Sequence, residues 1–90
     1  MGRYSVEFGY EPENSFLPEE RAEPLRGEIE ALQKAGFVRL GVKWEDFRGN
    51  RTRAVNFASS TRQCFADWVL RPDGTLLFYA YTRSQMARWS

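Results

Sequence analysis

Residues 65–81, with the sequence FADWVLRPDGTLLFYAY, constrain the fold more than any other stretch of the chain. Two runs of apolar and aromatic residues flank the tetrapeptide RPDG, whose proline and glycine occupy the second and fourth positions that a type I turn prefers. The stretch therefore predicts two antiparallel strands. A sheet that is covered on one side normally carries polar residues on its other face. Both alternating faces of this hairpin are apolar, so the fold must account for two apolar sheet faces.

Alternation divides the side chains of each hairpin strand into two sets. In the first strand, Cys64, Ala66, Trp68 and Leu70 oppose Gln63, Phe65, Asp67 and Val69. In the second strand, Leu76, Phe78 and Ala80 oppose Thr75, Leu77, Tyr79 and Tyr81. One helix can cover only one face of the sheet. We therefore expect the other face to be curled around its own core, covered by the tail through Met86 and Trp89, or buried against a second copy or a partner.

The N-terminal part of the chain predicts one strand and one main helix. Residues 3–10 alternate strictly between apolar and other residues, which indicates a half-buried strand. The helix is expected to begin at Pro24 and to present one apolar stripe. Gly36 suits a left-handed C-terminal cap. The stripe consists of Leu25, Ile29 and Leu32.

Four further strands are expected after the helix. In the first, 37–47, alternation predicts that Val38, Leu40, Val42 and Trp44 share one face, and Gly41 is expected to mark a bulge. The other strands are expected at 52–59, 62–70 and 75–82. The fold class is therefore α+β in the order β-α-β-β-β-β, with an antiparallel sheet of four to five strands and one main helix packed on one face.

Length and charge distribution favour one small domain. We expect residues 1–90 to form it, with 83–90 as a flexible tail. Residues 1–36 hold eight acidic and four basic side chains, a net charge of −4, whereas 37–90 hold four acidic and nine basic ones, a net charge of +5. The two parts attract each other, which favours a helix and a sheet of complementary charge.

The usual residues of catalysis are missing from this sequence. It contains no histidine, which removes the commonest general base and metal ligand, and its single cysteine, Cys64, is expected to be a small buried apolar residue. We therefore expect a non-enzymatic protein with no catalytic residues, no metal and no cofactor. No apolar run is long enough to span a bilayer and no signal peptide is evident, which favours a cytoplasmic protein without membrane contacts.

Asp67 interrupts an apolar strand and needs a partner. An unpaired carboxylate between Phe65 and Val69 would be costly to bury. Arginines on neighbouring strands are the expected partners, namely Arg39, Arg53 and Arg62. A cross-strand ion pair is therefore favoured over a catalytic acid.

Two alternative functions follow from other features. Residues 48–62, RGNRTRAVNFASSTR, contain four arginines and no acid, and arginines with nearby aromatics suit phosphates and stacked bases. Nucleic-acid binding is the first alternative, although the chain as a whole is not strongly basic. The second is a small-ligand pocket between helix and sheet that contains Asp67, Tyr79 or Arg39.

The aromatic sheet face leads to the main functional hypothesis. Tyrosine, tryptophan and arginine contribute much of the binding energy at protein interfaces. We expect a small inhibitor- or adaptor-like binding module that recognises a protein partner, or a second copy of itself as a homodimer, through this face. The expected apolar contacts are Trp44, Trp68, Tyr79 and Tyr81, with Arg48, Arg51 and Arg53 as a polar rim.

Overall fold

The computed structural model describes residues 6–84, and they form one antiparallel sheet with one α-helix beside it. The expected α+β class and element order are confirmed. The start of the first predicted strand, most of the predicted tail, and Met86 and Trp89 lie outside the described residues. The elements are β1 (Val6–Tyr10), the 3-10 helix η1 (Pro18–Arg21), α1 (Leu25–Lys34), β2 (Phe37–Phe47), β3 (Asn50–Ser59), β4 (Cys64–Leu70) and β5 (Leu76–Thr82).

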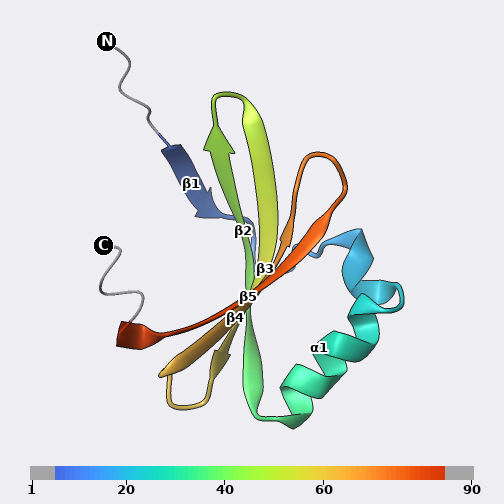
Figure 1. Ribbon diagram of the computed structural model, residues 1–90, viewed down its shortest axis with the longest axis vertical. Helices are drawn as coiled ribbons and strands as arrows, with labels where there is room; N and C mark the ends of the chain where they lie inside the picture. The colour runs from blue at the N-terminus through green and yellow to red at the C-terminus, as the bar shows by residue number, and fades with distance from the viewer. Residues whose placement is uncertain (1–5, 85–90) are drawn as a thin grey trace.

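The strands follow one another across the sheet in chain order. The order is β1-β2-β3-β4-β5, and every neighbouring pair is antiparallel. This arrangement leaves β1 and β5 at the two edges. Figure 1 shows a strongly twisted sheet with α1 along one side.

Helix α1 presents the predicted stripe to the sheet. It begins one residue after Pro24, and Leu25 and Ile29 are buried while Leu32 is half-buried. Gly36 follows the helix with a φ of 95°, a left-handed conformation that glycine adopts without steric penalty.

The core lies between α1 and one face of the sheet, called the helix face below. Leu17, Leu25 and Ile29 contact the helix-face residues Val42, Val55, Phe57 and Ala66, and all seven are buried. The opposite face is called the outer face. Cross-strand pairing places on it Phe8, Tyr10, Val38, Lys43, Glu45, Phe47, Ala54, Asn56, Ala58, Phe65, Asp67, Val69, Leu77, Tyr79 and Tyr81.

A β-bulge in β2 overturns the predicted faces of that strand. The register with β3 shifts between Arg39 and Gly41, and Gly41 has a φ of 143° that favours glycine. One extra residue reverses the alternation. Arg39 therefore lies on the helix face with Val42, whereas Val38 lies on the outer face, and the expectation that Val38 shares a face with Val42 is wrong.

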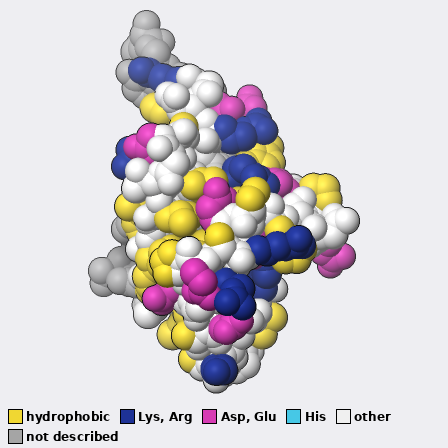
Figure 2. All heavy atoms as spheres, turned by 90° about the vertical axis from the view of Figure 1, so that its right-hand side faces the viewer, with side chains coloured by type: hydrophobic (Ala, Val, Ile, Leu, Met, Phe, Trp, Pro, Cys, Tyr) yellow, Lys and Arg dark blue, Asp and Glu magenta, His cyan; other side chains and the backbone are white. Residues whose placement is uncertain are grey.

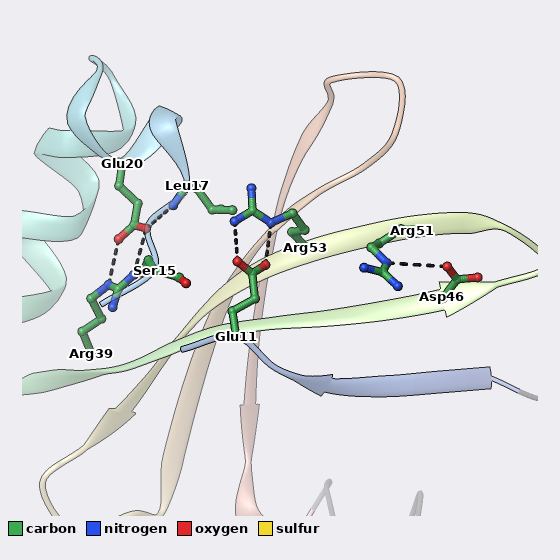
Figure 3. A network of polar contacts seen from close by, with 8 residues as sticks. All are labelled: Glu11, Ser15, Leu17, Glu20, Arg39, Asp46, Arg51 and Arg53. Carbon is green, nitrogen blue, oxygen red and sulfur yellow. Dashed lines mark hydrogen bonds and ion pairs between the residues drawn. The ribbon is translucent and has the colours of Figure 1, made fainter. Parts of the chain in front are cut away.

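Ion pairs hold the segment before α1 against the helix face (Figure 3). The Glu20 carboxylate accepts hydrogen bonds from Arg39 Nε at 2.8 Å and from the Leu17 backbone N–H at 2.7 Å. The Glu11 carboxylate accepts two more from Arg53, at 2.6 and 2.7 Å. These pairs join the acidic N-terminal part to the basic sheet, as the charge distribution predicts.

Candidate partner-binding face

A buried carboxylate lies at the centre of the outer face. Asp67 in β4 is only 5% exposed. Its Oδ1 accepts a hydrogen bond from the Asn56 amide, and its Oδ2 accepts one from the Tyr81 hydroxyl at 2.9 Å. Lys43 Nζ lies 3.5 Å from the same Oδ2. The four side chains come from β2, β3, β4 and β5, so the cluster ties together four of the five strands.

The arginine partners expected for Asp67 are wrong. Arg39 and Arg53 lie on the helix face and bind Glu20 and Glu11. Arg62 lies in the turn after β3 and donates to the backbone oxygen of Ser59. The bulge moved Arg39 to the helix face, and the alternation of β3 puts Arg53 there too. Cross-strand polar pairing of Asp67 is nevertheless present, with Asn56 directly opposite it.

Burial and charge make Tyr81 a persistent hydrogen-bond donor. Burial raises the pKa of the Tyr81 phenol well above its ordinary value of 10, and the neighbouring Asp67 carboxylate raises it further. The protonated hydroxyl can therefore donate to Asp67 throughout the physiological range. The ring of Tyr81 is also stacked on Phe65, with ring centres 5.5 Å apart.

The centre of the outer face is shielded from water. Asn56 and Asp67 are buried on this face even though α1 covers the other one. The sheet is strongly twisted (Figure 1), which fits the expected curling of the sheet around this face.

Exposed aromatic side chains surround the polar cluster. Phe8 is 75% exposed, Tyr10 68% and Tyr79 51%, and Val38 and Phe47 are exposed as well. Phe8 and Tyr10 come from one edge strand and Tyr79 from the other. The centre of the outer face is therefore shielded from water, whereas these marginal side chains are open to it.

The seven residues predicted to bind a partner do not form one surface. Tyr79 and Tyr81 lie on the outer face, whereas Trp44 and Trp68 lie on the helix face. Trp68 packs on Phe78 with ring centres 4.8 Å apart. The sheet itself separates the two tryptophans from the two tyrosines.

The three predicted rim arginines are also spread out. Arg53 is bound by Glu11, as described above, and this bond holds the pKa of the Glu11 carboxyl below its usual range. Arg51 Nε lies 3.5 Å from Asp46 (Figure 3). The Arg51 guanidinium lies 4.3 Å from the centre of the Trp44 ring. Arg48 lies in the turn after β2, over the Phe47 ring.

Several side chains of the outer face were not predicted from the sequence. Phe8, Tyr10, Lys43 and Asn56 were not among the predicted site residues. Alternation along residues 3–10 and 52–59 assigns Tyr10 and Asn56 to one face of their own strands. Only the register shows which faces of neighbouring strands lie on the same side of the sheet. Strand pairing, rather than residue type, was the missing signal.

The basic segment 48–62 does not form a continuous positive surface. Arg48 and Arg62 lie at opposite ends of β3, whose ten residues span about 30 Å. Arg51 and Arg53, between them, are paired with acidic side chains. Figure 2, which views the molecule from the side of α1, shows basic and acidic side chains interspersed.

A shallow hollow lies between α1 and the hairpin of β4 and β5. Its volume is about 310 Å³, and neither Asp67 nor Tyr79 can line it, because both lie on the outer face. The indole N–H of Trp68 is buried without a hydrogen-bond partner among the described residues. The hollow is lined by Glu28, Ala31, Leu32, Ala35, Trp68 and Phe78.

Cys64 is exposed, so the prediction that it is buried is wrong. It is the first residue of β4, and its backbone N–H donates a hydrogen bond to the hydroxyl of Ser59, the last residue of β3. Cys64 shares a face with Ala66 and Trp68, as alternation predicts, but the buried core residue nearest to it on β4 is Ala66.

Within residues 6–84, no three cysteine, aspartate or glutamate side chains lie close enough to hold a metal ion. No helix in the same part of the chain has the length and apolarity needed to cross a membrane. No protein-family model, curated protein or solved structure matches the chain. Its function is therefore argued from the geometry above.

Proposed function

We propose that the chain is a non-enzymatic binding module that recognises a protein partner through its outer face. One observation carries the proposal: Phe8, Tyr10 and Tyr79 are exposed on the face whose centre holds the buried Asp67 cluster. Small domains rarely leave several large apolar side chains together in water unless the surface binds something. Tyrosines at such a site combine a large apolar ring with a hydroxyl group, which suits protein interfaces.

The polar cluster supports recognition by holding the face in one conformation. Asp67 fixes the side chains of Tyr81, Asn56 and Lys43 by direct contacts. A surface ordered before it meets its partner loses less conformational entropy on binding. The cluster therefore acts as a rigid base at the centre of the exposed margin.

A protein fits this face better than a nucleic acid does. Lys43 is the basic side chain among the outer-face residues named above, and it lies beside the Asp67 carboxylate. Glu45 adds a negative charge on the same face. Nucleic-acid binding depends mainly on basic side chains that neutralise phosphates.

The exposed, unpaired thiol of Cys64 fits a reducing compartment, which supports the cytoplasm as the site of action.

Site-specific photocrosslinking tests the proposal. A benzoylphenylalanine replaces Phe8 or Tyr79 in the full chain, and matched control chains carry it at Glu30, which is exposed on α1. After irradiation in extract of the producing cells, we expect one saturable protein adduct from Phe8 and Tyr79 and none from Glu30. The purified adduct partner should then bind the wild-type chain, with a dissociation constant at least about ten-fold lower than for Tyr10→Ser.

Three results would overturn the proposal. One is equal labelling from all three positions, another is labelling of nucleic acid alone, and the third is an affinity that Tyr10→Ser leaves unchanged. The Tyr10→Ser chain must keep its folded circular dichroism spectrum for the comparison to count. Because the Tyr10 side chain is largely exposed, we expect little loss of stability from this substitution.

A further inference from the structure

We propose that β5 pairs edge to edge with β5 of a second copy of this chain, so that the two sheets become one continuous sheet. The contact uses the backbone of an edge strand, and it does not depend on the outer face binding a foreign protein. It rests on three features of β5: its outward backbone groups, its uncharged sequence and the hollow beside it.

The hydrogen bonds at the two ends of the β4–β5 ladder show which backbone groups point outward. The Arg71 N–H donates to the Thr75 oxygen, and the Arg83 N–H donates to the Gln63 oxygen, both at 2.9 Å. In an antiparallel ladder, residues bonded to the neighbouring strand alternate with residues whose N–H and C=O point away. Thr75 and Arg83 are both odd-numbered and bonded inward. The even-numbered Leu76, Phe78 and Ala80 therefore direct their N–H and C=O groups to the outer side of the edge.

No described strand pairs with that side of β5. Exposed edges are usually protected by charges, proline, a bulge or short length. Strand β5 has the sequence LLFYAYT, which is seven residues without charge or proline, and its register with β4 is unbroken. Phe78 and Tyr79 are both exposed. The opposite edge differs, because the described part of β1 is five residues long and carries Glu7.

The chemistry of β5 favours a second copy as the occupant. Antiparallel pairing about a two-fold axis brings each side chain near an identical set, so any charge on the strand would meet a like charge. Strand β5 contains none. With the axis at Phe78, Leu76 faces Ala80 of the second copy and Phe78 faces its own counterpart. Leu76, Phe78 and Ala80 of each copy then pair, which gives about six backbone hydrogen bonds.

The hollow provides space for this contact on the helix face. Phe78 lines it together with Trp68 and residues of α1, and its volume is about 310 Å³. Because Phe78 belongs to the edge strand, the hollow borders the proposed junction. An apolar side chain of the second copy can pack there and remove Phe78, which is 46% exposed, from water.

The first test is the molar mass of the purified full chain by sedimentation over a wide concentration range. We expect a monomer–dimer equilibrium in which Ala80→Pro raises the dissociation constant at least about ten-fold, because proline removes an outward N–H while sparing the β4–β5 ladder. The matched control Ala80→Ser keeps the N–H and should dimerise as the wild type does. Circular dichroism establishes that each variant is folded.

A charge-swap pair tests the register and does not alter the backbone. Phe78→Lys and Phe78→Glu should each be monomeric alone, because like charges meet at the two-fold axis, and their mixture should form a heterodimer. A wild-type monomer at every concentration would overturn the inference, as would a dimer that Ala80→Pro and both Phe78 variants leave intact. A dimer abolished by Phe8→Ser instead would place the contact on the outer face. That result would overturn edge pairing and leave the proposed recognition function standing.

Discussion

Replacing Glu20 by glutamine should destabilise the fold severely without changing its shape. The Glu20 side chain is 5% exposed and the Arg39 side chain 16% exposed. Glu20 Oε1 accepts from Arg39 Nε at 2.8 Å, and Oε2 accepts from Arg39 Nη2 at 3.0 Å and from the Leu17 N–H at 2.7 Å. Leu17 is fully buried in the core, so this carboxylate couples η1, β2 and the core.

The size of the effect follows from what glutamine cannot replace. If its single oxygen takes the position of Oε2, it keeps the hydrogen bonds from Leu17 and Arg39 Nη2, but its NH₂ group then faces the Arg39 Nε donor. The Arg39 guanidinium then stays largely buried without its counterion. Removing one partner of a buried ion pair costs about 3 to 5 kcal/mol. We expect the lower value, about 3 kcal/mol, because one acceptor remains. A ninety-residue domain has a free energy of unfolding on the order of 5 to 10 kcal/mol, so the loss is a large fraction of it.

Urea unfolding followed by tryptophan fluorescence measures the loss, since Trp44 and Trp68 both lie on the helix face. With an m value of about 1.5 kcal/mol per molar urea, the midpoint should fall by about 2 M. The matched control is Glu23→Gln, because Glu23 pairs with Arg26 at 2.6 Å but both side chains are more than half exposed. That change should cost less than about 1 kcal/mol. Equal midpoints for the Glu20 and Glu23 variants would refute the reasoning.

Three further predictions concern single side chains. The lowered pKa of Glu11 contributes stability that is present above pH 4.5 and is lost as the pH falls through the folded-state pKa. The melting temperature of the wild type should therefore fall more steeply in acid than that of Glu11→Gln. The raised pKa of Tyr81 contributes stability that is present below pH 10 and lost as the pH rises above it. Alkaline melting curves of Tyr81→Phe should lack this loss, while at neutral pH the variant should be about 1 to 2 kcal/mol less stable, because Asp67 loses a donor. Gly41→Ala should cost about 1 to 3 kcal/mol through its φ of 143° alone, since no atom lies near the added Cβ. The control Gly27→Ala, within α1, should be neutral or stabilising in the same thermal assay.

The elements could be predicted because their signals are local. The apolar stripe and the glycine cap delimit α1, and the RPDG turn delimits β4 and β5. The predicted faces of β3, β4 and β5 match the observed pairing, because none of these strands contains an interruption. Alternation gives the correct faces wherever the pleat is continuous.

The composition of the outer face could not be predicted from alternation. The bulge before Gly41 reversed the faces of half of β2, which moved Arg39 away from Asp67 and Val38 toward it. Gly41 was expected to mark a bulge, but the predicted faces of this strand did not include the reversal of alternation that a bulge causes. The pairing of β1 with β2 decides where Tyr10 lies, and this is a contact between segments more than thirty residues apart in the sequence.

Asp67 distinguishes two interpretations of the second apolar face, which are a second hydrophobic core and a binding surface. A dry second core would exclude a carboxylate, because burying one without partners is strongly unfavourable. The outer face instead buries Asp67 with a lysine, an asparagine and a tyrosine, and it leaves Phe8 and Tyr79 in water. A hydrogen-bonded centre with open aromatic margins resembles an interface more than a core. We therefore propose that the two apolar faces of the hairpin have different roles: the helix face stabilises the fold, and the outer face and the edge of β5 bind partners.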